Sequence, residues 1–377
     1  MWLEKIEILN YKNYETAKLE FSEQINSFVG SNGSGKTNLL DAIYYLSLTK
    51  SAFSSDEQQN IRHGAPFFMI KGSFSLENET YQIQFSLQQG QKKVIKNSKK
   101  VYEKISEHIG LFPVVLIAPN DTDIIRDGSD ARRKFFDGII SQINPSYLDS
   151  LLQYNHILRQ RNSLLKQFAE REYFDRDLLD TYSEPLLATG QVIYETRKAF
   201  LHSFYPYFDR HYQNLADQKE AVNIQYQSDL DQPDFAEAFG ENLGKDRALQ
   251  RTTMGIHKDD FLFEINAHPL KKFGSQGQQK SYVIALKLAQ FDIIKAQKNI
   301  KPLLLLDDIF DKLDDKRIQK LTEMMVRQSF GQLFVTDARP ERTLSVFDQL
   351  NAHKKVFYIE AGQVNSVHET ATSMPDE

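Results

Sequence analysis

The 377-residue sequence contains no cysteine, which excludes disulfide bridges and thiolate metal sites. It has no apolar run near the roughly 20 residues that a membrane span requires. Its first 21 residues carry acids and lack the long apolar core of a signal peptide. These absences predict a cytoplasmic protein without a membrane partner. Excess positive charge is also lacking, since the formal net charge is −5, so a DNA-binding surface would have to be a local basic stripe.

A glycine-rich segment near the N-terminus fits the phosphate-binding pattern G-x-x-x-x-G-K-[ST]. It follows a predicted strand at residues 25–29 and precedes a predicted helix at residues 38–48. Such a loop turns its backbone N–H groups toward phosphate oxygens, while the lysine reaches the β- and γ-phosphates and the threonine hydroxyl holds Mg²⁺. The predicted ATP-binding residues here are Gly30, Ser31, Asn32, Gly33, Ser34, Gly35, Lys36 and Thr37.

A second motif lies near the C-terminus, and its first aspartate stands 271 positions after Lys36. Four leucines at residues 303–306, which predict a buried strand, end in Asp307 and Asp308. We expect Asp307 to bind the Mg²⁺ shell and Asp308 to orient or activate the attacking water. A Leu-Asp pair follows at residues 313–314, where ABC-type ATPases have their D-loop. The wide spacing indicates that two halves of one ATPase fold flank a large insertion.

A third motif precedes a helical pattern that runs from residue 282 to 296. A serine and glycines at a helix N-terminus favour an anion site. In ABC-type ATPases this element closes on the γ-phosphate held by the partner subunit. The candidate residues are Ser275, Gln276, Gly277 and Gln278.

With these motifs in place, the chain resembles the RecF family, SMC-like ABC ATPases of bacterial recombination, over almost its whole length. Five further blocks match the family in order: residues 8–14 (ILNYKNY), 119–121 with 132–137 (RRKFFD), 154–166, 255–260 (GIHKDD) and 275–279 (SQGQQ). Three positions depart from the usual pattern, since Ile256, Lys258 and Lys280 replace Pro, Arg and Arg. No histidine follows the strand predicted at residues 333–336, so slow hydrolysis is expected.

The resemblance implies an α/β fold, an ABC-type ATPase head with mixed parallel and antiparallel sheets and an inserted helical arm. It implies catalytic roles for Asp308, Lys36 and Ser275, an ATP contact by Lys12, and metal binding by Thr37 and Asp307. The implied cofactors are ATP and Mg²⁺. The implied activity is a weak, DNA-stimulated ATPase that forms an ATP-dependent homodimer, clamps duplex DNA near single-strand gaps or junctions, and helps to load recombinase with RecR and RecO.

Three basic groups are candidates for DNA contact. The first, between residues 91 and 104, is equally a solvated hairpin tip, and its DNA-binding candidates are Lys92, Lys93, Lys96, Lys99 and Lys100. The second, at residues 126–134, is as suited to internal pairing as to DNA. The third comprises Arg159, Arg161 and Lys166 on the helical arm. His257 lies beside two aspartates, but nothing shows converging metal ligands, so we expect a structural or phosphate-adjacent role.

The patterns divide the chain into four parts. Residues 1–140 would form the N-terminal half of the head, 141–250 the helical arm, 251–367 the C-terminal half of the head, and 368–377 a flexible tail. Two alternatives stay open. An ABC transporter subunit would usually have Ser-Gly-Gly-Gln and a downstream histidine, which this chain lacks. A scaffold that binds ATP but scarcely hydrolyses it is compatible with Asp308, which stands where Glu is more widespread.

Overall fold

A computed structural model describes residues 1–216, 220–309, 320, 330–341 and 352–370 of the chain. Its contacts divide the chain into two compact units, which are described separately. Unit 1 comprises Met1–Asp121 and Gln290–Glu377, and unit 2 comprises Thr122–Ala289. Within the described ranges, no helix combines the length and apolarity needed to cross a membrane.

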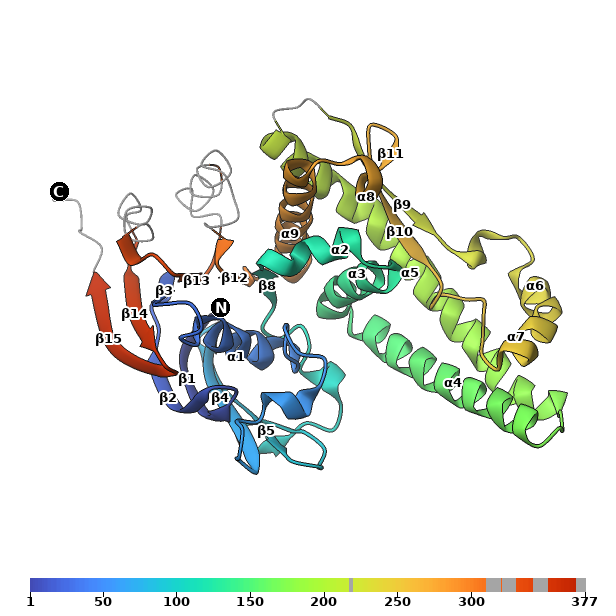
Figure 1. Cartoon of the computed structure of the whole chain (residues 1–377), viewed down its shortest axis with the longest axis horizontal. Coiled ribbons are helices and arrows are strands. Elements are labelled where there is room, and N and C mark those ends of the chain that lie inside the picture. Colours follow the sequence, from blue (N-terminus) through green and yellow to red (C-terminus); the bar gives the residue numbers. More distant parts are fainter. Residues whose placement is uncertain (217–219, 310–319, 321–329, 342–351, 371–377) are drawn as a thin grey trace. The chain divides into compact units, whose positions relative to one another are not determined.

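One sheet of unit 1 contains strands from both the N-terminal and the C-terminal parts of the chain. Its strands run in the order β15-β14-β3-β13-β12-β8, and all are parallel except the edge strand β15. Figure 1 shows blue β3 between red strands, so the N-terminal phosphate-loop strand is built into a sheet of C-terminal strands. The bounds are β3 Ile25–Val29, β8 Val114–Ile117, β12 Leu303–Leu306, β13 Leu333–Asp337, β14 Lys354–Glu360 and β15 Gln363–Thr370.

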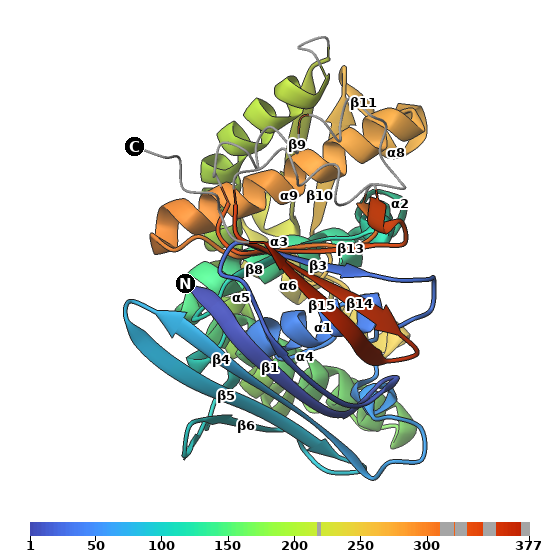
Figure 2. The ribbon, with the colours of Figure 1, turned by 90° about the vertical axis from the view of Figure 1, so that its left-hand side faces the viewer.

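The second sheet of unit 1 is antiparallel, in the order β2-β1-β4-β5-β6-β7. Its strands are β1 Trp2–Tyr11, β2 Tyr14–Glu20, β4 Phe67–Leu76, β5 Glu79–Gln88, β6 Val94–Asn97 and β7 Lys100–Val101; the short 3-10 helices are η1 Glu57–Asn60, η2 Ile105–Glu107 and η3 Pro119–Thr122. Helix α1, Lys36–Leu48, lies between the two sheets (Figure 2) and contacts strands of both. This explains why the helix is apolar on more than one face: Ile43 and Tyr45, which project from nearly opposite sides of the helix, are both fully buried.

Unit 2 is mainly helical. Helices α4, Pro145–Glu170, and α5, Arg176–Ala216, form a long helical hairpin, and a small antiparallel sheet has the order β11-β10-β9. The remaining elements are α2 Asp123–Arg126, α3 Ser129–Ile143, β9 Val222–Gln227, η4 Asp229–Asp231, α6 Phe235–Glu241, α7 Leu243–Leu249, β10 Asp260–Ile265, β11 His268–Pro269, α8 Leu270–Phe273 and α9 Gln276–Lys298. Helix α9 begins in unit 2 and continues past its boundary.

The unit boundaries differ from those predicted at residues 140 and 250. Strand β10 pairs with β9 along its whole length, and α3 contacts β10. Arg132 of α3 also binds Asp260 of β10 through Nε and Nη2, at 2.7 and 3.0 Å. Residues 122–140 and 251–289 therefore belong with the helical arm. The predicted tail also begins too early, because β15 extends to Thr370, while residues 371–377 lie outside the described ranges.

Buried ion pairs hold unit 2 together. Arg197, only 1% exposed, binds Asp137 (Nη2 to Oδ2, 2.9 Å) and Asp259 (Nη1 to Oδ2, 2.8 Å). Burial raises the pKa of Asp259, and the charge of Arg197 offsets part of that rise. Arg161, also 1% exposed, binds Asp246 at 2.7 Å. Tyr154 also contacts His257, so the three blocks at residues 132–137, 154–166 and 255–260 that carry the family resemblance meet in one internal network.

This network accounts for three arginines of the second and third basic groups. Arg132 and Arg133 bind β10 and the carbonyl oxygen of Asp259, and Arg161 is buried, so these three are internal. Lys134 instead pairs on the surface with Asp130 at 2.7 Å.

We predict that Arg197→Met lowers the free energy of unfolding by about 3–5 kcal/mol, because two carboxylates lose their buried cation. Urea unfolding followed by circular dichroism measures this. Arg176→Met is the matched control on the same helix, since its pair with Asp180 is exposed and 3.5 Å long. It should cost less than about 1 kcal/mol. Equal losses in the two variants would contradict the structural role of the network.

Candidate functional site

The glycine-rich loop connects β3 to α1, as the sequence predicts. Gly30 and Gly35 have φ angles of 153° and 116°, which favour glycine. Space is restricted as well, because a Cβ on Gly30 would lie 2.2 Å from the carbonyl oxygen of Ile359, and one on Gly35 would lie 2.6 Å from Nδ2 of Asn13. The loop is therefore a tight cradle that larger residues at these two positions would open.

The turn between β1 and β2 supports this cradle, which the motif alone does not reveal. Asn13 donates from Nδ2 to the carbonyl oxygen of Ser34 at 3.3 Å and accepts from Nδ2 of Asn38 at 2.7 Å. The hydroxyl of Tyr14 donates to the carbonyl oxygen of Gly35 at 3.1 Å. Asn13 and Tyr14 belong to the block at residues 8–14 that carries the family resemblance, and this contact explains their place there.

Lys36 and Ser34 point their polar atoms into the cradle. The ammonium of Lys36, a residue only 4% exposed, donates to the carbonyl oxygens of Gly30 and Ser31 at 2.8 and 2.9 Å. The hydroxyl of Ser34 is buried and has no hydrogen-bond partner among the described residues. A loop with turned glycines, a buried ammonium and a spare hydroxyl donor fits an anion such as a phosphate chain.

The two predicted metal ligands meet, although 270 positions separate them. The Thr37 hydroxyl donates to Oδ1 of Asp307 at 2.8 Å, and so does the Thr336 hydroxyl, also at 2.8 Å. Burial raises the pKa of Asp307, and the hydrogen bonds from Thr336 and Thr37 counteract this rise. A hydroxyl and a carboxylate side by side next to a phosphate cradle are oxygen ligands of the kind that Mg²⁺ prefers.

Asp308 follows at the end of β12 in a left-handed conformation, with φ of 41°. This backbone region is unfavourable for a residue with a side chain, and such strain is frequent at functional sites. The backbone N–H of Asp308 donates to the Thr336 hydroxyl at 2.8 Å. One threonine of β13 therefore holds both aspartates, a role that the sequence pattern did not reveal. The Leu-Asp pair at residues 313–314, predicted as the D-loop, lies outside the described ranges.

In the structure, Lys12 contacts Asp41 and Ser51 and not the glycine-rich loop. Its ammonium lies 2.6 Å from Oδ2 of Asp41, a buried residue of α1, and 3.5 Å from the Ser51 hydroxyl. The structure therefore brings Lys12 to the middle of α1, and an ATP contact by Lys12 stays a prediction.

The third motif forms the N-terminus of α9 in unit 2. Ser275 and Gln278 cap the helix reciprocally: the Ser275 N–H donates to Oε1 of Gln278 at 2.6 Å, and the Gln278 N–H donates to the Ser275 hydroxyl at 3.2 Å. Gln278 also donates from Nε2 to Glu220 at 2.7 Å. Ser275 and Gln276 are exposed, whereas Gln278 serves the internal structure. Their predicted contact with a nucleotide would come from another subunit.

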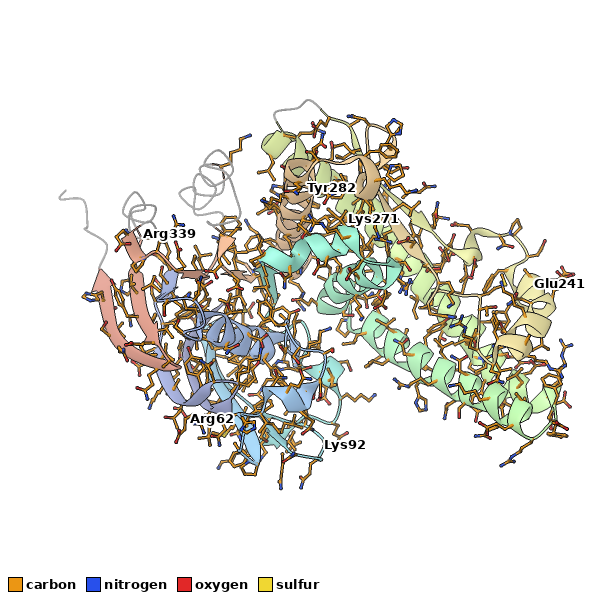
Figure 3. The ribbon with its side chains drawn as sticks, in the orientation of Figure 1. Arg62, Lys92, Glu241, Lys271, Tyr282 and Arg339 are labelled. Atoms are coloured by element: carbon orange, nitrogen blue, oxygen red, sulfur yellow. The ribbon has the colours of Figure 1, made fainter. Side chains whose placement is uncertain are left out.

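The lysine-rich stretch follows β5 and includes β6 and β7, the edge strand. Lys93 is not a surface cation, because it contacts the carbonyl oxygen of Thr49 and the carboxylate of Glu57, and its side chain is 12% exposed. Lys100 lies 3.7 Å from Glu107. Lys92 and Lys99 are exposed, and Lys96 is half-buried. Figure 3 labels Lys92.

His257 has a structural environment. Its Nδ1 lies 2.8 Å from the Tyr154 hydroxyl, and its Nε2 lies 3.1 Å from the carbonyl oxygen of Thr252. Burial lowers the pKa of His257 to about 4, so the ring is neutral near pH 7. Within the described part of the chain, no cluster of three or more His, Asp or Glu side chains is arranged to hold a metal.

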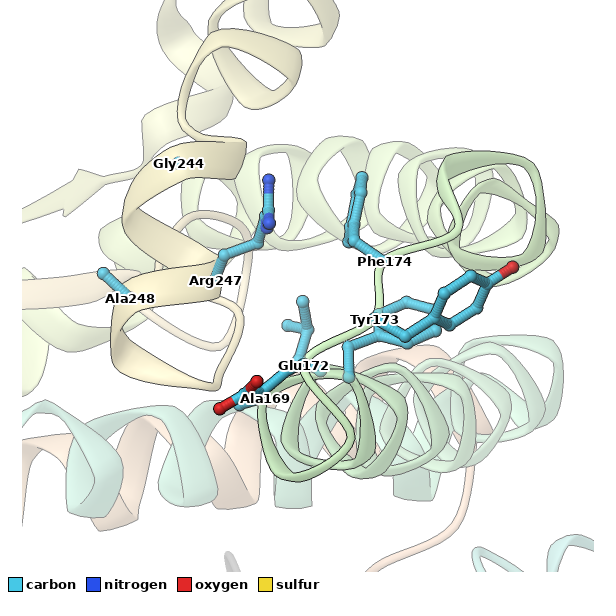
Figure 4. A pocket seen from close by; sticks show the side chains of 9 residues that line it. Ala169, Glu172, Tyr173, Phe174, Gly244, Arg247 and Ala248 are labelled. Atoms are coloured by element: carbon cyan, nitrogen blue, oxygen red, sulfur yellow. The ribbon is translucent and has the colours of Figure 1, made fainter.

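A separate cavity of about 480 Å³ lies in unit 2, between the end of α4, the loop that follows it, and α7. Figure 4 shows Arg247 beside Phe174 among its lining residues, with the guanidinium carbon 4.1 Å from the ring centroid, so the two side chains are in contact. None of the predicted site residues lines this cavity.

Comparison with known proteins supports the resemblance. A family described as the RecF/RecN/SMC N terminal domain matches residues 2–363. The DNA replication and repair protein RecF of Flavobacterium johnsoniae is 50% identical over 357 residues, covering 95% of this chain and 99% of that protein. The chain belongs to the RecF family. RecF of Cytophaga hutchinsonii is 48% identical over 365 residues, covering 97% of this chain and 96% of that protein.

Solved structures agree with this membership. The recombination mediator protein RecF-ATP of the RecFOR pathway matches with a TM-score of 0.88 and 30% identity, covering 98% of each chain. The Smc head domain of Pyrococcus furiosus matches with a TM-score of 0.56 and 17% identity, covering 98% of this chain and 96% of that chain, which shows the fold alone. The predicted ABC-type head fold is confirmed, and RecF membership makes the chain a DNA replication and repair protein of the SMC-like ATPase class.

We predict that Thr336→Val lowers the free energy of unfolding by about 1.5–3 kcal/mol at pH 7, because a charged carboxylate loses a buried donor. The loss should shrink near pH 4 and below. The folded-state pKa of Asp307 is already raised, the variant would raise it further, and a protonated carboxyl needs the donor less.

Urea unfolding at the two pH values measures this dependence. Thr336→Ser is the control, because it keeps the hydroxyl, and it should retain most of the stability. A loss in Thr336→Val that does not change with pH would contradict the proposed support of the Asp307 charge.

Proposed function

We propose that this chain is an ATP-dependent DNA-binding protein of recombinational repair and replication. It dimerises on ATP, clamps duplex DNA near single-strand gaps, helps to load recombinase, and hydrolyses ATP slowly. The observation that carries the proposal is the contact between Thr37 and Asp307 at 2.8 Å beside the glycine-rich cradle. Two motifs from opposite ends of the chain thus make one site of the P-loop ATPase kind.

In this proposal residues 30–37 bind the triphosphate of ATP, and Lys36 exchanges its loop carbonyl partners for phosphate oxygens. Mg²⁺, held by Thr37 and Asp307, would neutralise charge on the β- and γ-phosphates. Asp308 accepts a hydrogen bond from the attacking water, and the bond from its backbone N–H to Thr336 fixes the backbone that carries this carboxylate. The solved RecF-ATP relative supports ATP as the nucleotide.

The exposed start of α9 at Ser275 and Gln276 supports the proposal that ATP binding causes dimerisation. These residues form an anion-binding helix N-terminus whose backbone is shaped by its own capping box. In the proposed dimer they contact the γ-phosphate held by a second copy. ATP then lies between two incomplete half-sites, so its binding energy favours the dimer over the monomer.

Duplex DNA and single-strand junctions are the proposed substrates of the closed dimer. Of the five lysines predicted at the hairpin, Lys92, Lys96, Lys99 and Lys100 remain candidates for phosphate contact, while Lys93 is committed to Glu57. The RecFOR pathway named for the solved relative supports RecR and RecO as partners. The proposed action on DNA supports a location in the cytoplasm.

The experiment that tests this function is duplex DNA binding by fluorescence anisotropy, at one fixed salt concentration, with and without ATP and Mg²⁺. Wild type should bind more tightly with ATP and form dimers on size exclusion. Lys36→Arg should show neither change, because the planar guanidinium does not replace a compact ammonium in this tight cradle. ATP-dependent dimers of Lys36→Arg would contradict the nucleotide sandwich.

Hydrolysis needs its own test, because it separates the ATPase from the ATP-binding scaffold. We expect Asp308→Asn to keep ATP-dependent dimerisation and to lose about 10²–10⁴-fold in turnover, since a neutral amide cannot take a proton from the water as the carboxylate can. Steady-state phosphate release measures turnover. Glu20→Gln is the control, because it removes an exposed carboxylate at the end of β2 opposite Tyr14, and it should leave turnover unchanged. Equal turnover in wild type and Asp308→Asn would exclude a hydrolytic role for Asp308.

A further inference from the structure

The turn that joins β14 to β15 lies against the glycine-rich loop. Strand β14 is a parallel partner of β3, so the two strands end at the same edge of the sheet. The Gly362 N–H of this turn donates to the carbonyl oxygen of Ser34 at 2.8 Å. At the end of β14, the carbonyl oxygen of Ile359 is the atom that a Cβ on Gly30 would meet at 2.2 Å. The C-terminal hairpin therefore contacts the loop directly.

The turn has the backbone of a tight hairpin. Its two residues, Ala361 and Gly362, have φ angles of 49° and 76°. Two successive positive φ angles match the twist of the strands that such a turn connects. Space is restricted at the second position, because a Cβ on Gly362 would lie 2.6 Å from the backbone carbonyl oxygen of Asn13. A larger residue there must displace either this turn or the turn between β1 and β2.

The carbonyl oxygen of Ser34 has donors from both turns. It accepts from the Gly362 N–H at 2.8 Å and from Nδ2 of Asn13 at 3.3 Å. Because a peptide unit is planar and trans, the N–H of Gly35 points in the direction opposite to the Ser34 carbonyl oxygen. The two donors therefore hold the Gly35 N–H facing away from both turns.

We propose that Gly362 is a positioning residue of the nucleotide site. Through the Ser34 carbonyl oxygen, it directs the Gly35 N–H toward a phosphate group of bound ATP or ADP. Backbone N–H groups that already point inward bind a phosphate best, since a peptide unit that had to be ordered during binding would lower the affinity. This role rests on the proposed function only in that residues 30–37 bind nucleotide.

Two glycine variants of the full chain test this role. Gly362→Ala should weaken binding of a ribose-labelled fluorescent ADP with Mg²⁺ by about 2–12-fold, because the displaced turn no longer donates to Ser34. Gly90→Ala is the matched control, since Gly90 has a φ of 73° and nothing within 4 Å of where its Cβ would lie. It should carry similar backbone strain and bind ADP as wild type does.

Hydrogen exchange of the wild-type chain is a second measurement, which holds even if Gly362→Ala folds poorly. If the turn strengthens nucleotide binding, bound nucleotide strengthens the contact of the turn by the same factor. Exchange at the Gly362 amide should therefore slow when ADP and Mg²⁺ are added, while the Gly90 amide should not change. ADP is the probe because it lacks the γ-phosphate that the proposed dimer contact requires.

Three results would overturn the role of Gly362. They are wild-type affinity of Gly362→Ala for ADP, equal weakening in Gly362→Ala and Gly90→Ala, and exchange at Gly362 that ADP does not slow. A wild-type chain that binds neither ADP nor ATP would refute the proposed function and this role with it. A chain that binds ADP but does not dimerise with ATP would refute the dimer alone.

Discussion

Two threonine hydroxyls donating to one carboxylate oxygen are the contact on which the site depends. Thr37 belongs to the first turn of α1, Asp307 directly follows β12 and Thr336 lies on β13. Since hydrogen bonds to a buried charge are strong and directional, they fix the end of β12 against the start of α1. The parallel sheet makes this meeting possible, because β3, β12 and β13 all end at the same edge.

Much of this arrangement could be predicted from sequence because its signals are local. Four leucines ending in two aspartates specify β12, and the observed strand has the predicted bounds, Leu303–Leu306. The glycine-rich loop likewise specifies a strand before it and a helix after it. Burial of α1 between two sheets was harder to foresee, because a helix contacted on several faces loses the single apolar stripe on which such predictions rest.

What could not be predicted depends on contacts between distant residues. The arginines at 132, 161 and 197 look alike in sequence, yet each is internal because an aspartate far along the chain faces it. Because of contacts of this kind, unit 2 extends from residue 122 to residue 289, beyond the limits of 141 and 250 predicted for the helical arm. Lys93 shows the principle within the lysine-rich stretch: only the fold places Glu57 beside it, and charge counting along the sequence does not detect such a pair.

The place of β3 has a consequence for synthesis on the ribosome. Both strands that flank it, β13 and β14, are made near the end of the chain, whereas unit 2 is one continuous segment. At about 5–20 residues per second, β3 waits on the order of 15 to 60 s for its neighbours. A ribosome that stops after residue 289 but before β13 therefore leaves β3 and the nucleotide loop without either neighbouring strand, although all of unit 2 has been made.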